Sequence, residues 1–78
     1  MREWLVNLRR GSGRTLKDVA DEIGCSEGYL CLMEAGKRVK KMDLQMIGKI
    51  AMAFGESVYE LIGKEVEYEN RCNKVETR

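Results

Sequence analysis

The side chains best suited to chemistry in this chain are cations. Four of the five residues from 37 to 41 are basic: Lys37, Arg38, Lys40 and Lys41. A smaller basic group precedes them: Arg9, Arg10, Arg14 and Lys17. Any one of these residues is most simply solvated surface, but cations gathered on one face can neutralise phosphates, and such binding weakens with salt. Because the net charge is only +1, the distribution of charge and not its sum indicates phosphate binding.

Catalytic chemistry is not indicated by any residue pattern. The chain has no His, and no nucleophile stands beside a base in the sequence. Asp21 and Glu22 are neighbours, but adjacent positions on a helix diverge by about 100°, so they do not form a carboxylate pair. The segment Gly11-Ser12-Gly13 is too short to cradle a nucleotide. We therefore expect a protein that is not an enzyme and that takes no cofactor, and the sequence indicates no small-molecule ligand.

The cysteines and the hydropathy pattern indicate a setting for the chain. Its three cysteines, Cys25, Cys31 and Cys72, are odd in number and show no paired metal-ligand spacing, so no metal site is expected. Reduced thiols are typical of a cytoplasmic protein. The chain has no run of about twenty apolar residues, so no contact with a membrane is expected.

Five helices are expected to position the basic residues, because Pro is absent and strong helix formers dominate the composition. Apolar residues at helical spacing, polar first residues and glycine stops place these helices at about 2–10, 15–23, 26–34, 42–54 and 57–63. Thr15 and Asp18 form a pair similar to a capping box at the start of the second helix. The fold class predicted is all-α.

The chain changes character after Gly63, so we expect one domain at 1–63 and a charged tail at 64–78. Two patterns compete in the tail: Val66 and Tyr68 alternate with acidic residues as in an exposed strand, whereas Tyr68, Cys72 and Val75 have helical spacing. A mobile end is the simplest interpretation. The tail and the end of the fifth helix are also the candidates for a dimer contact, around Ile62, Val66 and Tyr68.

Residues 20–32 carry the most specific pattern in the chain. Ala20 stands four residues before the turn glycine Gly24, Ser26 can open the next helix, and the aliphatic Leu30 falls four residues further on. This spacing lets two short helices cross closely, as in a helix-turn-helix. The second helix of such a pair usually lies in the major groove of DNA.

With these residues in view, the chain resembles the phage-repressor, Cro-like helix-turn-helix regulators, the xenobiotic-response-element family. The resemblance covers residues 5 to about 63. It includes Leu8-Arg9, Gly13, Thr15, Val19-Ala20, Ile23-Gly24, Ser26, Leu30, Glu34, Gly36-Lys37-Arg38, residues 50–55 and residues 61–63. It implies a five-helix, lambda-repressor-like domain whose second and third helices form the DNA-reading unit.

The resemblance also implies a set of DNA contacts. Groove-facing positions on the third helix would be Ser26, Glu27, Gly28, Tyr29, Cys31 and Leu32. Contacts flanking the groove would come from Thr15, Lys17, Lys37, Arg38, Lys40 and Lys41. An Arg of the first helix commonly pairs with the Glu that ends the third helix in this family, and the matching residues are Arg9 and Glu34.

The chain departs from the family pattern in three places. Leu16 and Ala35 stand where Gln and Asn are common. The third helix has no Arg, Lys, Gln or Asn on its outward face, although these side chains are best suited to purine recognition. Glu27 can still accept a hydrogen bond from cytosine. Either DNA shape supplies part of the specificity, or this face has another role.

Two functions are therefore weighed. The first is a sequence-specific, double-stranded DNA-binding transcriptional regulator, similar to repressors of phages or mobile elements, that binds a two-fold site as a homodimer. The second is a protein-interaction module, an antitoxin or adaptor, on the same helix-turn-helix fold. The exposed acidic and apolar residues expected on the third helix favour this alternative.

Overall fold

The computed structural model describes residues 1–37 and 42–76, with side-chain surroundings as far as residue 71. These residues form five helices: α1 (Glu3–Ser12), α2 (Leu16–Ile23), α3 (Glu27–Ala35), α4 (Leu44–Phe54) and α5 (Val58–Glu76). The described residues contain no strand, which confirms the prediction of an all-helical chain. No helix in this part of the chain is long and apolar enough to cross a membrane.

Local sequence explains where α2 and α3 begin and end. The Thr15 hydroxyl accepts from the Asp18 amide at 3.1 Å, and the Asp18 carboxylate accepts from the Thr15 amide at 3.3 Å, which completes the expected capping box. Gly24, with φ of 81°, ends α2 in the left-handed region that favours glycine. The Ser26 hydroxyl accepts from the Tyr29 amide at 3.1 Å and caps α3.

Two predicted helix ends are wrong. The first helix continues past Arg10 through Gly11 and Ser12 to its cap at Gly13. The fifth helix continues through Gly63 as far as Glu76, so the strand expected as an alternative for the tail does not form there. The expected boundary at residue 63 therefore does not coincide with the end of a helix.

The reason for the longer α5 lies in its buried face. Leu61, Glu65 and Tyr68 follow one another at helical spacing and are 0%, 2% and 6% exposed. Gly63 lies on the exposed side of the helix, where it costs only about 1 kcal/mol relative to alanine. Burial of the following turns outweighs that cost, and the helix is not interrupted.

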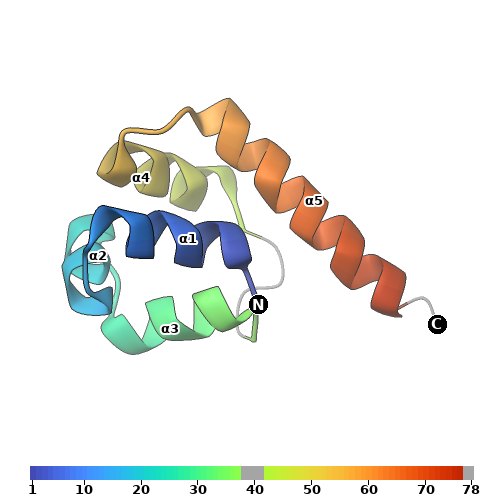
Figure 1. Ribbon diagram of the computed structural model, residues 1–78, viewed down its shortest axis with the longest axis horizontal. Helices are drawn as coiled ribbons and strands as arrows, with labels where there is room; N and C mark the ends of the chain where they lie inside the picture. Colours follow the sequence, from blue (N-terminus) through green and yellow to red (C-terminus); the bar gives the residue numbers. More distant parts are fainter. Residues whose placement is uncertain (38–41, 77–78) are drawn as a thin grey trace.

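The core lies where the five helices meet. Figure 1 shows α1 between α3 and α4, with α5 running along the side where the chain begins. Side chains with no exposed surface come from all five helices: Leu5, Val19, Leu30, Met33, Ile50 and Leu61. The last turns of α5 project beyond the other four helices (Figure 1). The core thus holds α3 from one side only and leaves its other side to solvent.

Candidate nucleic-acid interface

α3 presents one packed face and one open face. Leu30 and Met33 are 0% exposed and pack in the core beneath the helix. Most of the residues predicted to face a groove are exposed: Ser26, Glu27, Gly28, Cys31 and Leu32. Tyr29 is half-buried and packs against the core, so it lies at the margin of the open face. The geometry offers one carboxylate, one thiol and one aliphatic side chain to a partner.

Glycine at position 28 is not required by any internal contact. A Cβ placed there would meet nothing within 4 Å, and the residue is exposed. Glycine in a helix nevertheless costs about 1 kcal/mol relative to alanine. Gly28 does leave a stretch of α3 where a partner can approach the backbone without meeting a side chain.

Two exposed cations lie on α2 and directly after α3. Lys17 lies in the first turn of α2, and Lys37 follows the glycine cap of α3, where its amide donates to the carbonyl of Leu32 at 3.1 Å. Thr15 is exposed as well; its hydroxyl oxygen accepts the capping hydrogen bond and keeps its own proton to donate. The remaining predicted contacts lie outside the described residues: Arg38, Lys40 and Lys41.

Arg14, a member of the smaller basic group, is engaged within the fold. Its guanidinium donates to the Glu22 carboxylate at 2.9 Å and to the Ala53 carbonyl at 2.7 Å, and it lies 5.3 Å from the centre of the Phe54 ring. We call these four residues the Arg14 cluster. Arg10 and Lys17 are exposed, whereas Arg14 is half-buried and its guanidinium is engaged by these partners.

The structure contains the Arg9–Glu34 pair that the family resemblance implies. Arg9 Nε donates to Glu34 Oε2 at 2.7 Å and its terminal nitrogen to Oε1 at 3.2 Å. This hydrogen bonding raises the pKa of Arg9 above its ordinary value. Glu34 is 7% exposed, so its carboxylate is committed to α1 and is not part of the open face. The pair fixes α3 relative to α1.

A second and more deeply buried ion pair was not foreseen from the sequence. Arg2 is 0% exposed, and its Nε and a terminal nitrogen each donate to the Glu65 carboxylate at 2.8 Å. Trp4 Nε1 donates to the same carboxylate at 3.0 Å, and the Tyr68 ring centre lies 4.6 Å from the guanidinium. We call these four residues the Arg2 cluster. It joins the start of the chain to α5.

The sequence did contain one signal for this cluster. Glu65 lies four residues after Leu61 and three before Tyr68, so all three share the apolar face of the helix. A carboxylate on a buried face needs a charged or hydrogen-bonding partner. Which cation supplies it cannot be read from spacing, because Arg2 and Glu65 are 63 residues apart.

The two cysteines whose surroundings are described differ in accessibility. Cys31 is exposed on the open face of α3. Cys25 is half-buried, and burial raises the pKa of its thiol while Lys49 partly opposes the rise. Because the thiolate is the reactive form, burial and the raised pKa both lower the reactivity of Cys25, while Cys31 is the more accessible thiol.

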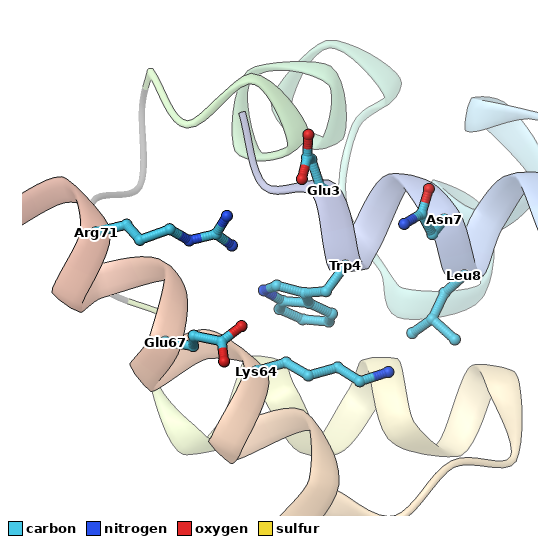
Figure 2. Close-up of a pocket in the computed structure, with 7 residues that line it drawn as sticks. All are labelled: Glu3, Trp4, Asn7, Leu8, Lys64, Glu67 and Arg71. Atoms are coloured by element: carbon cyan, nitrogen blue, oxygen red, sulfur yellow. The ribbon is translucent and has the colours of Figure 1, made fainter.

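A hollow of about 350 Å³ lies between α1 and α5 (Figure 2). Trp4 and Leu8 line it, and charged side chains of both signs surround it: Glu3, Glu67, Lys64 and Arg71. Because two carboxylates balance two cations there, the hollow favours neither an anion nor a cation.

Comparisons with known proteins give no family for this chain. No family model matches it, and no curated protein or solved structure matches it.

Proposed function

We propose that this protein binds double-stranded DNA, with α2 and α3 acting as a helix-turn-helix in a lambda-repressor-like domain. One observation carries the proposal: the face of α3 opposite the core is open from Ser26 to Leu32, exposed Lys37 follows the helix directly, and exposed Lys17 lies on α2. A capped, rigid helix with one free face and neighbouring cations suits a major groove bordered by phosphates.

The side chains assign a role to each part of this surface. Glu27 would accept from the amino group of a cytosine, and Cys31 or Leu32 would touch a thymine methyl group. Lys37, with Arg38, Lys40 and Lys41 after it, would contact phosphates and supply the part of the affinity that depends on salt. Few base contacts are available, so DNA shape would contribute to specificity.

In this proposal the protein is a transcriptional regulator, similar to a repressor, that acts as a homodimer on a two-fold site. Tyr59 and Val66 are 86% and 49% exposed and lie with half-buried Ile62 on one flank of α5, which supports a contact there. Tyr68, expected in that contact, is unsuitable because it is 6% exposed and packs over Arg2.

Selection of bound duplexes from a random pool, at stated salt, tests the proposal. We expect enrichment of a two-fold site whose half-sites are about one helical turn apart. Glu27→Ala should change the preference at a single base pair, whereas Glu60→Ala, the same charge change at an exposed position of α5, should change none. A pool that shows no enrichment, together with no binding to mixed duplex at low salt, contradicts the proposal.

The salt dependence of binding tests the phosphate contacts separately. Lys37→Ala should weaken binding to all duplexes and lower the slope of log affinity against log salt by about one. Lys64→Ala removes an exposed cation of α5 as the matched control and should leave the slope unchanged. An equal slope for wild type and Lys37→Ala would remove Lys37 from the interface.

The acidic and apolar character of the open face favours a second candidate, a protein-interaction module such as an antitoxin or adaptor. Leu32 is 38% exposed there, beside exposed Glu27. Such a module would show almost no affinity for mixed duplex even at low salt, so the same binding measurement separates the two functions.

A further inference from the structure

We propose that Arg2 and Glu65 are positioning residues for the surface formed by α3 and Lys37, so that α5 sets the geometry with which this surface meets DNA. The inference rests on the proposed function for its DNA readout. Its structural half concerns only the last turn of α3 and is tested without DNA.

The end of α3 is held by hydrogen bonds to Arg2. A terminal nitrogen of the Arg2 guanidinium donates to the Met33 carbonyl at 2.7 Å, and the Arg2 amide donates to the Glu34 carbonyl at 2.7 Å. Carbonyls at a helix C-terminus lack partners within the helix and carry the negative end of its dipole. The Met33 carbonyl also accepts from the Gly36 amide at 3.1 Å, so Arg2 adds a second donor at Met33, a donor at Glu34 and a positive charge at this end.

α5 in turn fixes the direction of Arg2. Glu65 accepts two hydrogen bonds from the guanidinium, and the Tyr68 ring lies against it at 4.6 Å. A planar guanidinium that donates hydrogen bonds from its edges and stacks a ring on its face is held in a single orientation. Movement of α5 at residues 65–68 would thus be transmitted through Arg2 to the carbonyls of Met33 and Glu34.

Tyr68 connects α5 to α3 at a second point. A Cβ at Gly36 would collide with the Tyr68 hydroxyl, so the ring reaches the cap that ends α3. Lys37 is the next residue, and its amide bonds to Leu32 within the same cap. The placement of Lys37 is therefore set next to the point where Tyr68 packs.

The N-terminal end of α3, in contrast, is held by residues close to it in the sequence. The Ser26 hydroxyl caps it and residues 24–26 join it to α2, so its contacts come from neighbours in sequence. Glu27 and Lys37 are carried by opposite ends of the helix. The placement of Glu27 and Lys37 relative to each other on a duplex depends on both ends of α3. Of these, only the C-terminal end, which carries Lys37, depends on α5.

The test compares Glu65→Gln and the milder Arg2→Lys with a matched control, Glu22→Gln, which weakens the Arg14 cluster in the same manner. Arg2→Lys keeps the positive charge but removes the planar guanidinium that donates two hydrogen bonds to the carboxylate. Binding to a mixed-sequence duplex at low salt, and to any duplex selected as above, is measured at a temperature where circular dichroism shows every variant folded. We expect the first two variants to lose about tenfold in affinity, within the range of couplings carried by packed contacts, and the control to lose none.

Hydrogen exchange gives the readout that does not require DNA. The amides of Gly36 and Lys37 should exchange about tenfold faster in Glu65→Gln than in wild type, as expected for local opening, while the Gly24 amide at the α2 cap keeps its rate. Trp4 is the only Trp in the chain, so its indole resonance reports directly whether the Glu65 contact is retained.

Each outcome decides one point. Folded variants with wild-type DNA affinity and unchanged exchange at Gly36 and Lys37 overturn the inference and leave Arg2 and Glu65 with a role in stability alone. If wild type binds no duplex, the proposed function fails, and exchange still decides whether α5 holds the end of α3. If Glu65→Gln does not fold, Arg2→Lys and Tyr68→Phe replace it in both measurements.

Discussion

Two arginines, one just before α1 and one just after it, have the same kinds of partner. Each donates to a carboxylate, donates to a backbone carbonyl in the last turn of another helix, and lies over an aromatic ring. For Arg2 the partners are Glu65, Met33 and Tyr68. For Arg14 they are Glu22, Ala53 and Phe54.

The two clusters differ in their access to water. The side chains of Arg2 and Glu65 are 0% and 3% exposed, whereas those of Arg14 and Glu22 are 35% and 47% exposed. Water and salt can replace an exposed partner, so such pairs contribute little. A buried charge that loses its partner has no replacement. Arg2 also bonds its carboxylate through two nitrogens, whereas Arg14 uses one. The same kinds of partner therefore carry unequal energetic weight, and of the two clusters only the Arg2 cluster can couple distant helices strongly.

The largest expected effect comes from Arg2→Ala. It leaves the Glu65 carboxylate buried without its cation and removes the donor to Met33, so the free energy of unfolding should fall by about 3–5 kcal/mol. Chemical denaturation followed by circular dichroism measures the loss. Arg14→Ala is the control and should cost about 1 kcal/mol or less. Equal losses for the two variants would remove the distinction between the clusters.

Gly36→Ala should have the next largest effect. Gly36 has φ of 74°, and a Cβ there would strike the Tyr68 hydroxyl. We expect a loss of about 1–3 kcal/mol from backbone strain, plus a contribution from the collision. Gly24→Ala is matched in φ, at 81°, but its Cβ would meet nothing within 4 Å. The difference between the two variants measures the packing of Tyr68, and Tyr68→Phe should reduce that difference.

Glu22→Gln should lower the free energy of unfolding by less than about 1 kcal/mol. Added salt should shrink this difference further, because exposed charges are screened. The corresponding loss for Glu65→Gln should persist in salt, since the pair is buried. Denaturation at low and high ionic strength makes the comparison, and equal salt sensitivity would argue against it.

The smallest effect concerns two thiols and extends the contrast between buried and solvated groups. Variants that keep only Cys25 or only Cys31 should react at different rates with a thiol reagent near neutral pH, Cys25 being slower. The raised pKa of Cys25 also predicts a small pH dependence: its contribution to stability is complete at low pH and is lost as pH rises through the folded-state value. Faster labelling of Cys25 would contradict this account.

Local sequence determined most of the helical framework and the open face of α3. Thr15, Ser26 and Gly24 specify caps and a turn with interactions that span only a few residues. The period of a helix then predicts which positions around Leu30 and Met33 are buried and which face outward. These features follow from the chain because their causes lie within one or two turns.

Tertiary structure alone decided the course of α5 and the partners of its buried carboxylate. Gly63 and the acidic residues after it read as the end of a domain, yet Glu65 and Tyr68 pack against Arg2 from the far end of the sequence. Burial supplies the free energy that keeps the helix intact through a glycine, and burial depends on contacts between segments far apart along the chain. The helical spacing of apolar residues does not report contacts between distant segments. Only the assembled core could therefore show that the end of α3 is held by α5.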